Sequence, residues 1–223
     1  AANRVAGMLV SMSQETTDIE HFRTVMRQGI PMVLFDRVAE DLEVSKVIVD
    51  DFEGAFAAVS YLIGNGRRRI AHLAGASSLY VSRKRREGYE AALREHGLSV
   101  RPEYILSGGY HEEDGRSGMR SLLALEAPPD AVFTINDPVA IGAFLHLREH
   151  GLAVPGDIAL IGFSNNPNSA LITPRLTTVN QPAFEIGRQA ASLLLKNFIA
   201  GNTSPPPVET IILKTRLIIR EST

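Results

Sequence analysis

Residues 130–166 read DAVFTINDPVAIGAFLHLREHGLAVPGDIALIGFSNN. Two short apolar, β-branched runs, residues 131–135 and 158–162, predict strands, and the longer segment between them predicts one helix. A candidate N-cap, Asp137, precedes a proline that suits the first helical position, and Gly151 is expected to end the helix with a positive φ. The stretch therefore predicts a βαβ unit.

Polar residues follow both predicted strands, Asn136 and Asp137 after the first and Ser164–Asn166 after the second. Ligands of open α/β sheets bind outside the carboxyl ends of the strands, so these clusters predict a binding site. An alternative interpretation is that Asp137 only caps its helix and that Ser164–Asn166 only form a turn.

The composition is that of an ordinary globular protein, with 44% hydrophobic and 22% charged residues among 223. A net charge of -2 gives no general attraction for nucleic acid, so a DNA-binding part is expected outside this chain. The absence of cysteine excludes disulfides and thiolate catalysis. No 18-residue apolar run predicts a membrane span, and the first six residues resemble no signal or transit peptide.

The alternation of strand and helix continues on both sides of this unit. Further strands are predicted at residues 5–10, 31–35, 47–49, 70–74, 104–106, 176–179 and 209–219. Segments with helical periodicity lie between most of them, including one that opens at Asp50–Asp51 and one that Ser82 is expected to cap. Such alternation is typical of α/β proteins with mainly parallel sheets.

Three short motifs suggest chemistry but lack essential parts. His146 and His150 lie four residues apart, yet Leu147 stands where zinc proteases need glutamate, and no third ligand is evident. Gly162–Asn166 resembles a nucleophile elbow but lacks its second glycine. Arg67–Arg69 could bind phosphate, although such runs more often form solvated corners. We therefore predict no metal, no cofactor and no covalent nucleophile.

Hydrogen-bonding side chains without an obvious base or metal collect at the predicted strand ends. They are Asp36, Asp50, Asp51, Ser82, Arg83, Arg85, Asn136, Asp137, Ser164, Asn165 and Gln181. Amides, carboxylates, hydroxyls and guanidinium groups together suit a small polyhydroxylated or polar metabolite. Binding rather than catalysis is therefore expected.

Short motifs along the whole chain occur in the order and spacing of one known family. They are VAGMLV (5–10), PMVLFDR (31–37), VDDFEGA (49–55), LIGNGRRRIA (62–71), RREGY (85–89), PDAVFTIND (129–137), GLAVPGDI (151–158), IGF (161–163), LTTVNQP (176–182) and LIIREST (217–223). Together they resemble the effector-binding core of the LacI/GalR family of bacterial transcription regulators.

The resemblance implies a periplasmic-binding-protein-like α/β fold, in which two parallel-sheet subdomains are joined by three crossovers and hold the effector between them. The N-terminal subdomain is expected to comprise residues 1–65 and 183–212, and the C-terminal subdomain residues 66–182 and 213–223. Family members carry an amino-terminal DNA-binding helix-turn-helix and two βα units before the first strand found here. Both are absent from this chain, so an incomplete first subdomain is expected.

The resemblance also implies which residues bind the effector. They are Arg85, Asn136, Ser164, Gln181, Asp51 and Glu53, and Ser82 is added to them from the ring at the predicted strand ends. Arg85 matches the arginine that grips effector hydroxyls or carboxylate, and Asp51 or Glu53 is expected to face the site from the opposite subdomain. The family usually has aspartate where Ser164 stands, and this loss of charge shifts the expectation from a simple sugar toward a phosphorylated or acidic derivative.

The expected partners are a small effector, which by resemblance is a sugar or sugar derivative, a second copy of the chain, and operator DNA bound through the absent helix-turn-helix. No membrane is involved, and the expected compartment is the cytoplasm. Residues that match the family's dimer interface are Pro138, Ile141, Leu145, Leu171 and Ile172. Effector binding is expected to control operator binding allosterically.

Two other functions remain open from the sequence. The leading alternative is a periplasmic sugar-binding protein of a transport system, which shares the fold. The second is an α/β hydrolase-like enzyme that uses Ser164.

Overall fold

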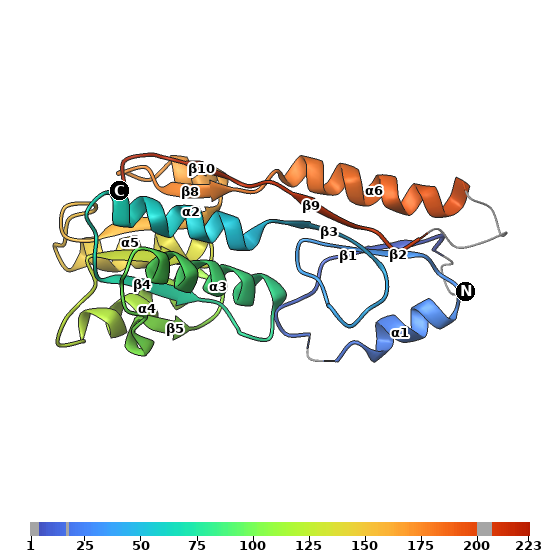
Figure 1. Cartoon of the computed structure of the whole chain (residues 1–223), viewed down its shortest axis with the longest axis horizontal. Coiled ribbons are helices and arrows are strands. Elements are labelled where there is room, and N and C mark those ends of the chain that lie inside the picture. The colour runs from blue at the N-terminus through green and yellow to red at the C-terminus, as the bar shows by residue number, and fades with distance from the viewer. Residues whose placement is uncertain (1–4, 17, 200–206) are drawn as a thin grey trace. The chain divides into compact units, whose positions relative to one another are not determined.

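The computed structural model describes residues 5–16, 18–199 and 207–223. The chain forms two compact α/β units, labelled by their helices and strands in Figure 1. The first unit is drawn from residues 1–50, 78–81 and 182–214, and the second from residues 51–77, 82–181 and 215–223. Each unit is therefore built from segments that are far apart in the sequence.

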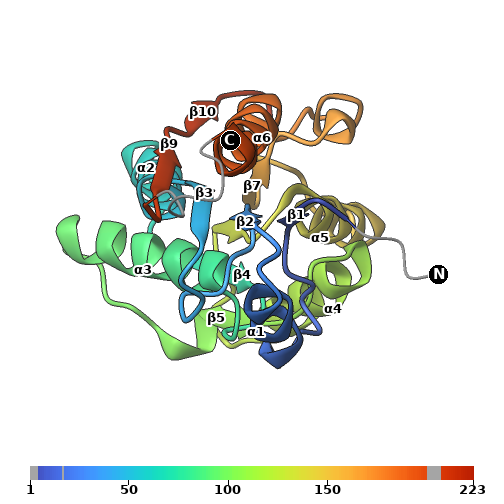
Figure 2. The ribbon, with the colours of Figure 1, turned by 90° about the vertical axis from the view of Figure 1, so that its right-hand side faces the viewer.

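The first unit is a parallel sheet with a helix on each face. Its strands are β1 (Met8–Val10), β2 (Met32–Phe35), β3 (Ser45–Val49) and β9 (Thr210–Leu213), in the order β1-β2-β3-β9. Figure 2 shows α1 (Glu20–Arg27) and α6 (Ala183–Ile199) on opposite sides of these strands. Val33 packs with α6 and Leu34 with α1, because successive side chains of a strand point to opposite faces.

The second unit contains a six-stranded sheet of order β10-β8-β7-β6-β4-β5. Its strands are β4 (Ile70–Ala74), β5 (Ile105–Ser107), β6 (Ala131–Thr134), β7 (Ala159–Ser164), β8 (Thr177–Asn180) and β10 (Arg216–Ile218). Its helices are α2 (Asp51–Gly64), α3 (Tyr80–Glu95), α4 (Glu112–Leu123), α5 (Asp137–Glu149) and two 3-10 turns, Pro102–Tyr104 and Pro167–Ala170. Every strand pair is parallel except β10 with β8. The α/β class with mainly parallel sheets is confirmed.

Two hydrophobic cores cover the two faces of this sheet. On one face α2 and α3 pack over Phe133 and Ile161, and on the other α4 and α5 pack over Val132 and Leu160. Adjacent residues of β6 and β7 thus serve different layers, as the two-residue period of a strand requires. The result is a three-layer sandwich whose buried strands are apolar on both faces, as is usual for parallel sheets.

Helices α4 and α5 approach each other through glycine. A Cβ at Gly142 would lie 1.8 Å from the carbonyl oxygen of Glu112, and one at Gly115 would lie 2.0 Å from that of Val139. No side chain fits at such distances, so the backbones touch where these two residues face each other. This contact fixes α5, whose first residues follow β6 at the carboxyl edge of the sheet.

The border between the units differs from the expected one. The resemblance places residues 51–65 in the N-terminal subdomain, whereas α2 groups with the second unit because Ala55, Val59 and Leu62 are buried in the core beneath it. The single strand predicted at residues 209–219 is also wrong. It is two strands in two sheets: β9 runs parallel to β3, and β10 runs antiparallel to β8.

The residues after β10 are bonded into the second unit. Ser222 is buried; its hydroxyl donates to the carbonyl oxygen of Leu160 at 2.6 Å and accepts the N–H of Thr177 at 2.8 Å. Its carbonyl oxygen accepts the N–H of Leu160 at 2.9 Å. These bonds connect β7 and β8 at their amino-terminal ends. Among the described helices, none has the length and apolar character needed to cross a membrane.

Candidate binding site at the sheet edge of the second unit

The carboxyl ends of the parallel strands bring the predicted ligand residues of the second unit together. Asn136 follows β6, Ser164 ends β7 and Gln181 follows β8. These three strands are consecutive neighbours in the sheet, so the three residues lie along one edge. Ser82 and Arg85 come from α3, which follows the next strand, β4.

Arg85 is buried at this edge and is held on three sides. Its Nε and Nη2 lie 2.8 and 2.7 Å from Asp51 Oδ1, and its Nη1 donates to the carbonyl oxygen of Ile135 at 2.5 Å. Its guanidinium carbon lies 3.6 Å from the centroid of the Phe163 ring, which makes a cation–π contact. The side chains of Arg85 and Asp51 are 4% and 1% exposed. These contacts fix the orientation of the predicted effector arginine.

Asp51 and Glu53 do not come from the opposite unit. Both lie in the first turn of α2, which belongs to the second unit together with Arg85. Asp51 is buried, whereas Glu53 is exposed. Acidic side chains at this position also interact favourably with the positive end of the helix. The helix that carries Asp51 and Glu53 therefore groups with Arg85, whereas the resemblance implies that these two residues face the site from the opposite subdomain.

Asn136, and not Asp137, is the N-cap of α5. Its Oδ1 accepts the N–H of Val139 at 3.0 Å, and its Nδ2 donates to the carbonyl oxygen of Tyr110 at 2.9 Å. Ser82 lies inside the first turn of α3 and does not cap it, because α3 already begins at Tyr80. The Ser82 hydroxyl is instead hydrogen-bonded to the phenol of Tyr110.

Tyr110 is the residue that the sequence did not single out. It connects two predicted ligand residues, Ser82 through its hydroxyl and Asn136 through its carbonyl oxygen. A Cβ at Gly75 would lie 2.6 Å from the Tyr110 ring, so glycine at that position allows the contact. The available signal was an aromatic residue directly after Gly108–Gly109, at the carboxyl end of a strand.

The loop after β7 has an unusual backbone and is held by Asp137. Ser164 and Asn165 have φ values of 109° and 54°, in the left-handed region. Asp137 is fully buried; its two oxygens accept the N–H of Asn166 and the hydroxyl of Thr178, each at 2.6 Å. Burial raises the pKa of Asp137 to about 6, and these two bonds act in the opposite direction. Asp137, which the sequence predicts as a helix cap, therefore holds the loop after β7 in place.

Asn165 links this loop to the end of the chain. Its Nδ2 donates to Asn180 Oδ1 at 3.0 Å, and its Oδ1 accepts Nη2 of Arg220 at 2.7 Å. The other end of the Arg220 guanidinium, Nη1, donates to Ser169 Oγ at 2.9 Å and to the carbonyl oxygen of Leu176 at 2.7 Å. Arg220 thereby supports the edge without standing at a strand end itself.

The edge has hydrogen-bonding groups but no assembled catalytic set in the part of the chain that the structure describes. No hydrogen bond joins the Ser164 hydroxyl to a histidine, and no three His, Cys, Asp or Glu side chains gather as a metal site. His146 is largely buried, which lowers its pKa, and its carbonyl oxygen lies 2.8 Å from Nδ1 of His150. The arrangement fits binding.

The three arginines at residues 67–69 form hydrogen bonds with backbone carbonyl oxygens of the same unit. Arg67 donates to the carbonyl oxygen of Pro155 at 2.6 Å and Arg68 to that of Ile63 at 2.8 Å, while Arg69 donates to that of Pro128 at 2.8 Å. These carbonyl contacts support the corner interpretation over a phosphate patch.

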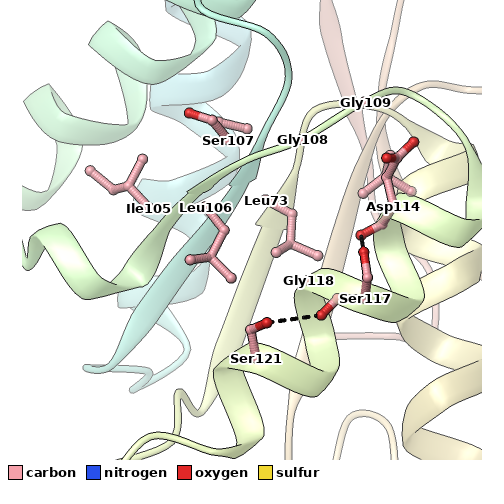
Figure 3. A pocket seen from close by; sticks show the side chains of 12 residues that line it. Leu73, Ile105, Leu106, Ser107, Gly108, Gly109, Asp114, Ser117, Gly118 and Ser121 are labelled. Carbon is pink, nitrogen blue, oxygen red and sulfur yellow. Dashed lines mark hydrogen bonds between the residues drawn. The ribbon is translucent and has the colours of Figure 1, made fainter.

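A separate hollow of about 270 Å³ lies beside β5 and α4 (Figure 3). Leu73, Leu106 and Gly118 line it, together with the hydroxyls of Ser117 and Ser121. Figure 3 shows that these two hydroxyls bond back to carbonyl oxygens of their own helix. None of the predicted ligand residues lines this hollow.

The five predicted dimer residues differ in exposure. Leu171 is 78% exposed, and Pro138, Leu145 and Ile172 are partly exposed. Ile141 is buried within its own unit at 7% exposure, so it has little surface left for a partner.

Comparisons with known proteins identify the family and the fold. A family model described as the periplasmic binding protein-like domain matches residues 59–223. The HTH-type transcriptional repressor PurR of Actinobacillus pleuropneumoniae serotype 3 (strain JL03) is 37% identical over 220 residues, covering 98% of this chain and 64% of the repressor. The chain thus spans less than two thirds of that relative.

Solved structures extend the similarity to ligand complexes. The transcriptional regulator CelR in complex with cellobiose has a TM-score of 0.90 and 31% identity, and the match covers 100% of this chain and 67% of that one. A LacI family transcriptional regulator from Enterococcus faecium with bound ribose has a TM-score of 0.85 and 28% identity, covering 98% and 80%.

Proposed function

The chain belongs to the LacI family of transcriptional regulators, and on that premise we propose that it is the effector-sensing domain of a DNA-binding regulator. The observation that carries this proposal is the edge of the second unit, where a fixed arginine of α3 accompanies the amides and hydroxyl that follow or end β6, β7 and β8. Such groups hold a small polar metabolite by directional hydrogen bonds. The effector is a sugar or a sugar derivative, as cellobiose and ribose are in two similar regulators.

The proposed ligand residues divide into two kinds. Arg85, Asn136 and Ser82 are positioned by bonds to their neighbours, so they offer their remaining donors and acceptors at fixed places. Ser164, Gln181 and Glu53 lie at strand or helix ends with side chains that are partly or fully exposed. Asp51 acts through Arg85, to which it is paired.

Operator DNA is proposed to bind through a part of the protein outside these 223 residues, since the net charge of -2 gives this chain no general affinity for DNA. Effector binding then changes operator affinity because the effector favours one arrangement of the regulator over another. The working form is a cytoplasmic homodimer, in which the exposed Leu171 and its neighbours contribute to subunit contact.

A thermal-shift screen tests the proposed effector class. The chain is heated alone and with neutral sugars, sugar acids and sugar phosphates, and a ligand at 100 times its Kd stabilises the folded state by about 2.7 kcal/mol. Arg85→Lys keeps a positive charge beside Asp51 but loses the planar fork, so it should abolish most of the shift. Arg94→Lys, on the exposed face of the same helix, is the matched control and should respond like the wild type.

Stabilisation by no member of the panel, or an equal response from Arg85→Lys, would contradict the proposal. A periplasmic transport role is not favoured, because the similar proteins are named as repressors and regulators. Ester turnover that Ser164→Ala abolishes would instead support the hydrolase alternative.

A further inference from the structure

The charged side chains that bond to neighbours within this edge balance one another. Four charged side chains bond within the edge: Arg85, Arg220, Asp51 and Asp137. Two are cationic and two are anionic in their ionised forms, and the groups between them are neutral hydroxyls and amides. Arg85 therefore presents no uncompensated positive charge to a ligand at this edge.

The positive charge of Arg85 is compensated most directly by the carboxylate of Asp51. Two guanidinium nitrogens lie within 2.8 Å of one carboxylate oxygen, and both side chains are nearly inaccessible to water. In so dry a place the attraction is hardly screened, and a second anion would have to compete with a carboxylate that is already in position. Displacing Asp51 would also leave a buried carboxylate without its partner.

Arg85 nevertheless retains hydrogen-bonding capacity. A guanidinium has five N–H donors, and the contacts to Asp51 and to the carbonyl oxygen of Ile135 use three of them. One N–H on each terminal nitrogen therefore remains for a ligand oxygen. A hydroxyl accepts such a bond without bringing a charge, whereas a carboxylate or phosphate must also overcome repulsion from Asp51.

We propose that Asp51 sets the charge class of the effector: by neutralising Arg85 it makes the site select an uncharged polyhydroxylated molecule over a sugar acid or sugar phosphate. This inference rests on the proposed function. It reverses the expectation drawn from Ser164, because the charge balance depends on Asp51 and Arg85 rather than on one strand-end position. Asp51 is thus a specificity-determining residue.

Matched ligand pairs test the proposal. Glucose and glucuronate, or galactose and galacturonate, differ only in a CH₂OH and a carboxylate group, and ribose and ribose 5-phosphate differ by one phosphate. Calorimetric titration of the wild type should show tighter binding of the neutral member in each pair that binds. Asp51→Asn should shift the acid-to-neutral affinity ratio toward the acid by about 10- to 1,000-fold, the range by which one charge at 4–6 Å moves a protonation equilibrium.

Two further variants separate the role of Asp51 from general effects. Glu95→Gln removes one negative charge from the exposed end of α3 and should leave the ratio unchanged. Asp51→Asn combined with Arg85→Gln removes both charges, so it should not gain affinity for acids. If Asp51→Asn alone does not fold, a wild type that binds the charged member of a pair more tightly still overturns the proposal.

Inorganic phosphate provides a readout that does not depend on sugar recognition. Phosphate should stabilise Asp51→Asn against heat more than it stabilises the wild type or Glu95→Gln. A wild type that prefers the charged member of a pair, or an Asp51→Asn variant that gains no affinity for uronate or phosphate, overturns the proposal. If no sugar of either class binds the wild type, the proposed function fails on this panel. The comparison of phosphate stabilisation between Asp51→Asn and the wild type then still tests whether Asp51 excludes anions.

Discussion

Acidification is expected to destabilise the second unit through His72, a residue of β4 that plays no part in the proposed site. His72 is fully buried, its Nδ1 lies 3.0 Å from the carbonyl oxygen of Phe133, and its ring stacks on Phe133 and Tyr89 at 4.8 and 5.2 Å between centroids. Burial lowers the pKa of His72 from 6.5 to about 4, and the nearby Arg85 acts in the same direction. The folded protein therefore holds a neutral imidazole that the unfolded chain protonates.

The magnitude follows from this pKa difference. His72 contributes stability that is present above pH 6.5 and is lost as the pH falls toward about 4. The complete loss is about 3 kcal/mol, at roughly 1.4 kcal/mol per pKa unit, and about 2 kcal/mol is lost by about pH 5. An asparagine at this position can still donate to the Phe133 carbonyl oxygen but does not titrate.

Asp137 opposes this trend. Its pKa is raised from 3.8 to about 6, so it contributes stability that is present below pH 3.8 and is lost as the pH rises through about 6. On going down to about pH 5 it returns about 1.4 kcal/mol to the folded state. The two residues together should change the free energy of unfolding by less than about 1 kcal/mol in that range.

Urea denaturation at about pH 7.5 and about pH 5 separates the two contributions. Relative to the wild type, Asp137→Asn should lose about 1.4 kcal/mol more on acidification, and His72→Asn should lose about 2 kcal/mol less. The comparison cancels every group that titrates equally in all three proteins. Identical pH dependences in wild type and both variants would refute the reasoning.

Two further predictions concern packing and assembly. Gly142→Ala should destabilise the protein by about 1–3 kcal/mol or more, because α4 and α5 must separate to make room for the methyl group. Gly187→Ala is the control: its methyl group would meet no atom within 4 Å, so it should stabilise the protein by about 0.5–1 kcal/mol. Urea midpoints distinguish the two variants, and equal effects on stability would contradict the contact between α4 and α5. Leu171→Glu should raise the dimer dissociation constant by about tenfold or more in sedimentation velocity, since burying leucine contributes about 1.5–3 kcal/mol. Phe184→Glu, at a similarly exposed position on α6, is its control, and a dimer unaffected by Leu171→Glu would exclude that surface.

The βαβ unit at residues 130–166 was predictable because its signals are local. Periodicity located the strands and helix, and Gly151 has the expected positive φ of 72°. The cap was misplaced by one residue because both Asn136 and Asp137 are good caps. The choice depends on Thr178 and the loop after β7, which bind Asp137 from another part of the chain.

Other features depend on tertiary contacts that no local pattern shows. The apolar run at residues 209–219 has uniform strand propensity, so only its pairing with β3 and β8 reveals that it divides between two sheets. Asn136, Ser164 and Gln181 lie at strand ends as predicted, whereas Ser82 and Arg85 lie within α3. The bond between Tyr110 and Ser82 was not predictable, because it joins residues 28 positions apart through side chains.

Strands β9 and β10 follow each other in the chain but complete different sheets, and this order has a consequence for biosynthesis. The N–H of Glu209, next to β9, bonds to the hydroxyl of Ser45, 164 residues earlier in the chain. At a translation rate of ~5–20 residues per second, Glu209 is therefore synthesised roughly 10–30 s after Ser45. Strand β8 likewise has an unpaired edge until β10 has been synthesised. Neither half of the molecule can finish folding on the ribosome ahead of the other, so a nascent chain arrested before Glu209 would present unpaired strand edges in both halves at once.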